Sequence, residues 1–320
     1  MDTKEEFEEM TENENNLPFI SFVVLTFNNK NSITNCLDSI VKQEYPCFEL
    51  IVVDDDSTDG TLEIIKKYMR GNQNLRLLRS GEHNIGKSRR IGVAESKGEI
   101  CALIDSDCEL PREQWAKTMV RPFLGDEKVA GTWTLGAYRK NYPSIARYSI
   151  LSNPYRQTKL PPVIDRENYW PVGTGHILLK KKAILEVGGF RDLKAGEDVD
   201  LTQRIIERGY KLVYVNGCEV YHLHASNLKQ FLKKYKRDVK STLSYGPKTL
   251  RGVSSGNGMK FLFSNLLIYP IYASVRGFRK DRDIAWFWHP AICLAKYFIV
   301  AKSILELKTR GWRNMYKDNE

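Results

Sequence analysis

Residues 19–104 alternate between strand-like and helix-like segments, and this alternation constrains the fold more than any other feature. Short runs that fit buried strands occupy 19–25, 48–53, 74–79 and 99–104. Amphipathic or capped segments that fit helices occupy 33–41, 61–69 and about 87–97. Continuous apolar runs are typical of strands covered on both faces of a sheet. The spacing therefore predicts βαβ units and an α/β fold with a mostly parallel, twisted sheet flanked by helices.

Polar side chains follow three of these strands, where each strand ends. These groups are Thr26-Phe27-Asn28, Asp54-Asp55-Asp56-Ser57 and Asp105-Ser106-Asp107. In open α/β sheets, ligands bind outside the carboxyl ends of the strands. The sequence therefore predicts a ligand site at this edge of the sheet.

The aspartates 54–56 end the second strand and enter a turn. Asp and Ser bind backbone N–H groups in turns, and this explanation is favoured for Asp56 and Ser57. A carboxylate at a strand end can also accept a hydrogen bond from the ring N–H of a nucleobase. Asp55 is the candidate for that role, and the ring of Phe27 could stack on the base.

Asp105 and Asp107 are separated by one residue, and side chains at i and i+2 of an extended segment point the same way. Two carboxylates make a hard oxygen site for Mg²⁺ or Mn²⁺, with phosphate oxygens completing the shell. The alternative is a strand end with two solvated acids. Further along, the helix expected at 196–210 begins with three acids, which are either helix-dipole partners or the source of a general base.

Taken together, these segments resemble the inverting family 2 glycosyltransferases with the GT-A fold. The segments that carry the resemblance are VVLTFNNKNSITNCLDSI, ELIVVDDDSTDGT, EICALIDSD, VGTGHILLKKKAILEVGGFRD and GEDVDLTQRIIERGYKLVYV. They occur in the family's order between residues 19 and 225.

The resemblance implies a role for each matching residue on the donor side. Asp55 would bind the nucleobase, in a pocket lined by Thr26, Phe27 and Asn28. Asp105 would contact the donor nucleotide.

The resemblance also implies the metal, the base and the acceptor contacts. Asp107 would bind the Mn²⁺ or Mg²⁺ ion that bridges the donor's diphosphate. His222 or His224 would approach the same ion, and His224 is the predicted ligand. Asp198 would be the catalytic base that deprotonates the acceptor hydroxyl, and Glu197 would either hold the acceptor or orient the base.

Two departures from the family's pattern stand out. Asp56 replaces the usual glycine of the turn, and Asp tolerates the left-handed conformation. The segment 84–94 is about two residues shorter than usual. Lys87, Arg89 and Arg90 are candidates for the diphosphate there, and Lys87 is the predicted nucleotide-binding residue.

The segment 137–171 is rich in Tyr, Arg, Lys and Pro and is expected to form part of the acceptor side. Its aromatic rings could pack on sugars, and Trp170 is the predicted acceptor contact. The alternative is a solvated, cationic surface loop.

The C-terminal part predicts contact with a membrane surface. A basic amphipathic helix begins after Ser226, and the apolar segments 261–275 and 284–300 follow. At 1.5 Å per residue they span about 22 and 25 Å, less than the roughly 30 Å hydrocarbon core. We expect an interfacial hairpin, with a two-span hairpin or a homo-oligomer interface as alternatives.

Charge and cysteine content fit this organisation. The chain carries a net charge of +10, of which residues 226–320 contribute +13 and the acidic segment 1–16 contributes −6. Because the C-terminal bases are interleaved with apolar runs, they favour lipid over nucleic acid. Six cysteines without regular spacing indicate reduced thiols in a cytosolic compartment. Because basic residues flank the apolar segments, we expect the catalytic domain at the cytoplasmic face of the cell membrane.

The sequence thus predicts a disordered tail at 1–16, a catalytic domain at 17–225 and a membrane-associating region at 226–320. The expected activity is metal-dependent transfer of a sugar from a nucleotide-diphosphate sugar. A UDP-sugar is the favoured donor. The expected acceptor is a hydroxyl of a polyprenyl-phosphate-linked or similar membrane glycan. The alternative is a non-catalytic scaffold subunit with the same fold.

Overall fold

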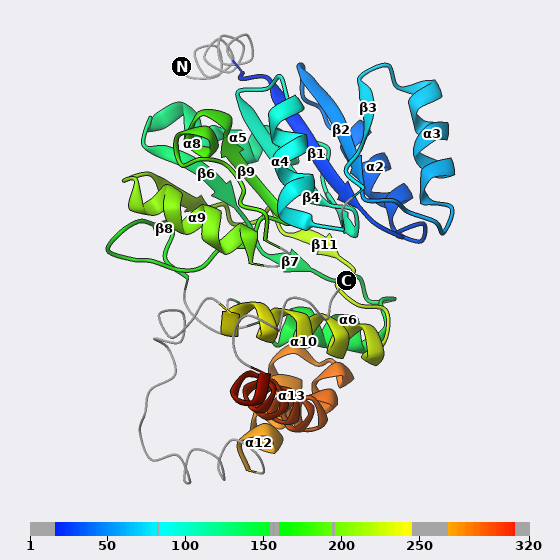
Figure 1. Cartoon of the computed structure of the whole chain (residues 1–320), viewed down its shortest axis with the longest axis vertical. Helices are drawn as coiled ribbons and strands as arrows, with labels where there is room; N and C mark the ends of the chain where they lie inside the picture. Colours follow the sequence, from blue (N-terminus) through cyan, green and yellow to red (C-terminus); the bar gives the residue numbers. More distant parts are fainter. Residues whose placement is uncertain are drawn as a thin grey trace, which may run out of the picture. The chain divides into compact units, whose positions relative to one another are not determined.

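The computed structural model describes residues 17–81, 83–153, 156, 160–193, 196–244 and 268–310. They fall into two compact units (Figure 1). The first unit comprises Met1–Ala137 and Leu160–His222, and the second comprises Tyr138–Lys159 and Leu223–Glu320. The predicted acidic tail and residues 261–267 of the first apolar segment lie outside the described residues.

The first unit is built on an eight-stranded sheet with the order β3-β2-β1-β4-β9-β6-β10-β8. The strands are β1 (Ile20–Thr26), β2 (Phe48–Asp54), β3 (Leu75–Arg79), β4 (Ile100–Asp105), β6 (Val129–Trp133), β8 (Val163–Ile164), β9 (His176–Lys180) and β10 (Lys211–Tyr214). Strands β1 to β4 are parallel, and β6 pairs in parallel with β10. Strand β9 runs antiparallel between β4 and β6, and β8 pairs antiparallel with β10.

A second, three-stranded sheet belongs to the same unit. It has the order β5-β11-β7, formed by β5 (Cys108–Glu109), β11 (Val220–His222) and β7 (Gly136–Ala137). Because β5 follows β4 after two residues, this small sheet is tied directly to the end of the central strand.

The helices of the first unit cover the large sheet (Figure 1). They are α2 (Ile33–Val41), α3 (Thr61–Gly71), α4 (Ile85–Glu95), α5 (Trp115–Gly125), α8 (Lys181–Glu186) and α9 (Glu197–Glu207). The predicted mostly parallel α/β architecture is confirmed, and the four predicted strands and the first three helices end within two residues of their expected bounds.

Alternate residues of β1 explain why its sequence is continuously apolar. Ile20, Phe22 and Val24 lie in one core with the buried faces of α2 and α5. Val23 lies on the other side, against α4, where a Cβ on Gly92 would come within 2.3 Å of Val23 Cγ1. Only glycine allows the helix to approach the strand this closely, so both faces of the sheet are covered.

The second unit is helical. It contains α6 (Ser144–Leu151), α10 (Leu228–Ser244), α12 (Tyr269–Asp281), the 3₁₀ helix η2 (Ile284–Trp288) and α13 (His289–Arg310). Ile145, Tyr148 and Leu151 of α6 share a buried cluster with Phe231 and Trp286. Residues 138–159, which the sequence analysis places in the catalytic domain, therefore group with the C-terminal helices in the structure.

Helix α10 is the predicted basic amphipathic helix. Its residue Phe231 is buried in the core of the second unit, while Lys229, Lys233 and Lys236 are exposed. The apolar side of α10 thus packs against neighbouring helices and the basic side faces solvent.

Helix α13 is longer than the apolar segment that predicted it. Its 22 residues span about 33 Å, whereas the apolar segment 284–300 begins in η2 and ends within α13. The helix does not stop at Pro290, because that proline stands in the first turn, where its missing N–H costs no helical hydrogen bond. Among the described residues, Ile284–Glu306 is the one helical stretch whose length and composition would allow it to cross a membrane, which by itself is weak evidence that it does.

Candidate active site

The loops that follow β1 and β2 are joined by side-chain hydrogen bonds. Asn28 has a left-handed backbone, its N–H donates to Ser57 Oγ at 2.9 Å, and its Oδ1 accepts from the N–H of Thr58 at 2.8 Å. The amide oxygen of the predicted nucleotide-binding residue Asn28 therefore holds two strand ends together. This arrangement fixes the backbone beside Phe27.

The Asp55 carboxylate lies at the same edge of the sheet and is held in place by two donors. Its Oδ1 accepts from Ser80 Oγ at 2.6 Å and from the N–H of His83 at 3.0 Å. The His83 ring lies 5.0 Å from that of Phe27, which is 47% exposed. A carboxylate and an exposed aromatic ring are thus present where the sequence predicts a nucleobase.

The neighbouring aspartates take the structural roles of the turn. Asp54 Oδ2 accepts from the N–H of Ser57 at 3.0 Å, and Asp56 adopts a φ of 63°. The prediction that Asp56 tolerates the left-handed position of the usual glycine is confirmed. Thr26 is buried and its carbonyl accepts from the N–H of Asp55 at 3.0 Å, so its place in the pocket lining stays a prediction.

Arg89 of α4 is buried between two carboxylates. Its Nη2 donates to Asp105 Oδ1 at 3.1 Å, and its Nε lies 3.2 Å from Glu197 Oε1. The side chains of Arg89 and Glu197 are 4% and 3% exposed. One guanidinium thus connects the end of β4 with the first residue of α9.

The environment of Glu197 changes its pKa. Burial raises the pKa of Glu197 above the usual range of a carboxyl group. The Arg89 guanidinium opposes this rise, and the neighbouring Asp198 carboxylate adds to it. The Glu197 carboxylate is buried against Arg89, and its two predicted roles, holding the acceptor or orienting the base, stay predictions.

A glycine-rich segment lies between Asp105 and Asp198. A Cβ on Gly175 would come within 2.6 Å of Asp105 Oδ2, and a Cβ on Gly173 would come within 3.2 Å of Asp198 Oδ2. The N–H of Asp105 donates to Gly175 O at 2.8 Å. The predicted nucleotide-binding residue Asp105 and the predicted base Asp198 therefore lie beside the two ends of the segment 173–175.

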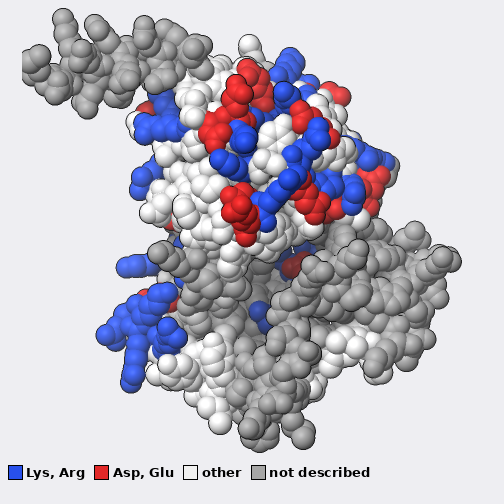
Figure 2. All heavy atoms as spheres, turned by 90° about the vertical axis from the view of Figure 1, so that its left-hand side faces the viewer, with Lys and Arg blue, Asp and Glu red and all other residues white. Residues whose placement is uncertain are grey.

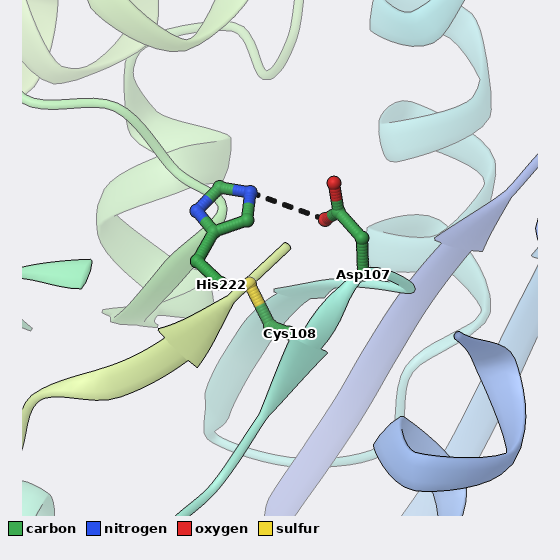
Figure 3. Close-up of side chains that lie close together, drawn as sticks. All are labelled: Asp107, Cys108 and His222. Atoms are coloured by element: carbon green, nitrogen blue, oxygen red, sulfur yellow. Dashed lines mark ion pairs between the residues drawn. The ribbon is translucent and has the colours of Figure 1, made fainter. Parts of the chain in front are cut away.

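Asp107, Cys108 and His222 form the group of side chains that could hold a metal ion among the described residues (Figure 3). His222 Nε2 lies 3.2 Å from Asp107 Oδ1. A carboxylate oxygen and an imidazole nitrogen suit Mn²⁺, so the residues fit the divalent ion that the sequence predicts.

Of the two candidate histidines, His222 is the one in this group, and its binding of the ion stays a prediction. His224 belongs to the second unit, where its Nδ1 lies 3.1 Å from Ser149 Oγ. Strand β11 brings His222 to the position opposite Cys108, which local sequence could not reveal.

Lys87, Arg90 and Trp170 are the remaining candidates from the sequence. Lys87 is half-buried in the first turn of α4, while Arg90 pairs with Asp192 at 2.8 Å. Trp170 is half-buried in the segment between β8 and β9. The roles of Lys87 at the diphosphate and of Trp170 at the acceptor stay predictions.

Four residues of the site were not predicted in these roles: Arg89 as a link between carboxylates, His83 beside Asp55, Cys108 beside Asp107 and His222, and Gly175 beside Asp105. The Gly-Thr-Gly sequence at 173–175 was a detectable signal, since paired glycines often mark a close approach of backbone. The others depend on contacts between distant segments.

Family models match most of the chain. Residues 21–187 match Glycosyl transferase family 2, and residues 167–301 match Glycosyl transferase family group 2. The first match covers more than half of the chain, so this protein belongs to glycosyl transferase family 2 and is a glycosyltransferase.

Two relatives support this assignment. Glycosyltransferase AglE of Haloferax volcanii is 29% identical over 211 residues, which are 63% of this chain and 67% of AglE. The poly(ribitol-phosphate) beta-N-acetylglucosaminyltransferase TarS of Staphylococcus aureus is 39% identical over 97 residues, which are 29% of this chain and 17% of TarS. The match to TarS therefore spans less than a fifth of that relative.

Solved structures share the fold. The mannosyltransferase PcManGT from Pyrobaculum calidifontis, in complex with GDP-Man and Mn²⁺, has a TM-score of 0.58 at 19% identity, covering 95% of this chain and 83% of its own. TarS residues 1–349 in complex with UDP have a TM-score of 0.54 at 18% identity, covering 90% and 91%. These similarities identify the GT-A fold.

Proposed function

We propose that this glycosyltransferase moves a sugar from a nucleotide-diphosphate donor to a hydroxyl acceptor, with inversion at the anomeric carbon and with Mn²⁺ or Mg²⁺ bound. The observation that carries the proposal is the segment 173–175, which has the carboxylate of Asp105 at one end and that of Asp198 at the other. A donor contact and a base thereby flank one narrow stretch of backbone.

The donor is proposed to be a UDP-sugar. The Asp55 carboxylate accepts the ring N–H of uracil, and Phe27 supplies an exposed ring on which the base stacks. TarS has been solved with UDP, which supports this class, while PcManGT has been solved with GDP-Man. Guanine also carries a ring N–H, so GDP is the competing donor nucleotide.

Asp107 and His222 would hold the divalent ion. When bound, that ion neutralises the negative charge that develops on the departing diphosphate. Asp198 accepts the proton of the acceptor hydroxyl, and the hydroxyl attacks the face of the anomeric carbon opposite the diphosphate. Arg89 and Glu197 hold the beginning of α9, and therefore Asp198, against the end of β4.

A thermal-shift panel tests this proposal. UDP, GDP, CDP and dTDP are each added with Mn²⁺ or with EDTA to wild type, Asp107→Ala, Asp198→Asn and the control Asp192→Asn, whose exposed side chain pairs with Arg90. When Mn²⁺ is present, we expect one of the nucleotides to bind and so raise the melting temperature. This increase should occur in wild type, Asp198→Asn and Asp192→Asn, but not in Asp107→Ala. If none of the four raises it in folded wild type, the donor site is wrong.

Turnover then separates binding from chemistry. With the nucleotide sugar identified by the panel, Asp198→Asn should lower kcat by about 10² to 10⁴, the usual contribution of a general base. Asp192→Asn should leave kcat unchanged. Equal turnover of wild type and Asp198→Asn would remove Asp198 from the mechanism.

The acceptor is proposed to be a lipid-linked glycan, presented at the cytoplasmic face of a membrane. One side of α13 is held to α10 by Lys296, whose Nζ lies 4.8 Å from the Tyr235 ring centroid. Leu294, Phe298 and Leu305 are 47%, 61% and 62% exposed on another side of α13. An apolar side of this kind is suited to the boundary between headgroups and acyl chains.

The exposed basic residues of the second unit also support a membrane surface as the partner. The second unit exposes Arg276, Arg279, Lys280 and Arg282 in and directly after α12, close in sequence to the exposed apolar residues Ile271 and Tyr272. In Figure 2, by contrast, basic and acidic side chains are interspersed over the face that carries α8 and α9, where Arg191 and Arg204 both pair with Asp200. Of the two acidic residues beside these bases, Asp281 accepts from Trp286 Nε1 and Asp283 pairs with Arg147. The exposed basic residues of this segment therefore favour anionic headgroups.

Vesicle flotation tests the membrane proposal. Wild type should float with vesicles of phosphatidylglycerol and phosphatidylcholine, and less with phosphatidylcholine alone. Phe298→Asp should reduce the bound fraction, whereas Leu185→Asp should not, since Leu185 is 57% exposed against 61% for Phe298 but lies on α8 of the first unit. If Phe298→Asp instead dissociates a dimer seen by light scattering and floats as wild type does, the apolar side is an interface between two copies.

A further inference from the structure

Asp107, Cys108 and His222 direct three chemically different donor atoms to one point (Figure 3). The carboxylate oxygen, the thiol sulfur and the imidazole nitrogen all lie within 4.8 Å of one another. In the proposed function, the Asp107 carboxylate and the His222 imidazole hold the divalent ion, and the thiol of Cys108 has no role.

The thiol is fixed by the small sheet rather than by a loop. Cys108 in β5 and His222 in β11 are register partners of an antiparallel pair. Residues directly opposite each other in such a pair project to the same side with Cβ atoms about 4.5–5.5 Å apart. Asp107 directly precedes β5, so all three residues are held by one hydrogen-bonded pair of strands.

The site is also shielded from water. Cys108 is 1% exposed, the His222 side chain 11% and the Asp107 side chain 23%. Cys108 Sγ donates to Gly175 O at 3.5 Å, in the segment beside Asp105. The sulfur therefore contacts the glycine-rich segment and also lies within 4.8 Å of the Asp107 oxygen and the His222 nitrogen.

A hard ion and a soft ion use these donors differently. Mn²⁺ and Mg²⁺ prefer oxygen ligands, whereas Zn²⁺ and similar ions bind thiolate and imidazole strongly. At a given site, Zn²⁺ also binds more tightly than Mn²⁺. Zinc sites with three protein ligands keep a fourth position open. With Zn–S of about 2.3 Å and Zn–N or Zn–O of about 2.0 Å, tetrahedral ligand atoms lie about 3.5 Å apart, a spacing that the present atoms approach.

We propose that Asp107, Cys108 and His222 form a three-ligand site for a zinc-class ion, which binds without nucleotide and displaces the catalytic Mn²⁺ or Mg²⁺. This inference rests on the proposed function only in assigning the same position to the donor's ion. Binding forms a metal–sulfur bond and breaks the S–H bond of Cys108, and the proton passes to solvent. A dipositive ion is then balanced by one thiolate and one carboxylate, so the shielded site becomes neutral.

Cobalt titration of the full chain tests the ligand set directly. Co²⁺ is added to reduced protein without nucleotide, and absorption is recorded for wild type, Cys108→Ser and the control Cys47→Ser, which removes another thiol of the first unit. We expect a near-ultraviolet thiolate-to-cobalt band and the visible bands of a tetrahedral ion in wild type and Cys47→Ser. Cys108→Ser should lack the thiolate band.

Zinc affinity and competition give the size of the effect. Cys108→Ser should weaken Zn²⁺ binding by at least about tenfold. Metal affinity falls by that factor even when the residue removed only hydrogen-bonds to a metal ligand. The Zn²⁺ concentration that halves Mn²⁺-dependent nucleotide binding should rise by a similar factor in Cys108→Ser. Should the buried substitution prevent folding, X-ray absorption of the wild-type zinc complex replaces it, with a Zn–S distance of about 2.3 Å expected.

The results distinguish this inference from the proposed function. Nucleotide binding with Mn²⁺ but no thiolate band or Zn–S distance would overturn the zinc site and leave the glycosyltransferase mechanism intact. A thiolate band with no nucleotide binding would support the zinc site and contradict the donor site. Equal Zn²⁺ affinity in wild type and Cys108→Ser would overturn the ligand set.

Discussion

Gly175 lies so close to Asp105 that a Cβ on this glycine would stand 2.6 Å from Asp105 Oδ2 and 3.1 Å from its Cγ. Asp105 also donates its N–H to Gly175 O, and its Oδ1 accepts from Arg89. The carboxylate is therefore held between a backbone segment and a buried guanidinium. Its position depends on the absence of a side chain at residue 175.

Gly175→Ala should lower kcat/KM by about 10²-fold, because displacing a catalytic or donor-binding group by about 1 Å has an effect of that size. The added methyl group forces the Asp105 carboxylate away from Arg89. Steady-state kinetics measure the effect, and Gly125→Ala is the control, since a Cβ there meets nothing within 4 Å. Unchanged kinetics in Gly175→Ala would show that the exact position of Asp105 is unimportant.

Arg89→Met should destabilise the first unit by about 3–5 kcal/mol, because it leaves the carboxylates of Asp105 and Glu197 without their buried cation. Urea denaturation measures the change in the free energy of unfolding. Arg90→Met is the matched control, and its exposed ion pair with Asp192 should contribute no more than about 1 kcal/mol.

The double variant Arg89→Met/Glu197→Gln distinguishes the charge effect from lost packing. It should recover part of the stability, since Gln at position 197 needs neither the buried cation nor the proton that Glu197 must take up when Arg89 is absent. If the double variant is no more stable than Arg89→Met, packing of the Arg89 side chain explains the loss and the ion pairs do not.

Phe27→Ala should raise the Kd of the bound nucleoside diphosphate about tenfold, since stacking of a base on an aromatic ring contributes about 1–3 kcal/mol. Stability should change little, because Phe27 is 47% exposed. Isothermal titration calorimetry measures the Kd, with the exposed Leu124→Ala as control. An unchanged Kd would place the base away from Phe27.

Asp283→Asn should destabilise the second unit by about 2 kcal/mol at neutral pH, because the hydrogen bonds involved are charge-assisted. Asp283 accepts from Arg147 at 2.8 and 3.1 Å and caps η2 through the N–H of Ala285. Burial alone would raise the pKa of Asp283, but these hydrogen bonds outweigh burial and lower it below its ordinary value.

The difference between wild type and Asp283→Asn should depend on pH in one direction. The pKa of Asp283 is lower in the folded than in the unfolded chain, so its contribution is complete above the ordinary carboxyl pKa of about 4 and is lost in more acidic solution. Urea denaturation at several pH values checks this, with the exposed Asp238→Asn of α10 as control. A difference that stays constant into strong acid would contradict the ion pair.

Local sequence patterns predicted the elements of the first unit well because those patterns act within a few residues. The apolar run at 19–25 specified a buried strand, and the Asp105-Ser106-Asp107 cluster marked the end of another. Helix α13 shows the limit of this approach. Its apolar segment ends near residue 300, but the helix continues to Arg310, and its Glu306 pairs with Lys240 of α10 at 3.4 Å.

The sequence by itself determined the mostly parallel sheet, the edge at which its polar side chains gather and the candidates Asp55, Asp107 and Asp198, because strand period and strand ends are encoded locally. The tertiary structure decided which residues meet. It placed His222 beside Asp107, buried Glu197 against Arg89, and brought Cys108 within 4.8 Å of Asp107 and His222. These pairs join segments up to 115 residues apart, and only the pairing of strands and the packing of α4 against α9 bring them together.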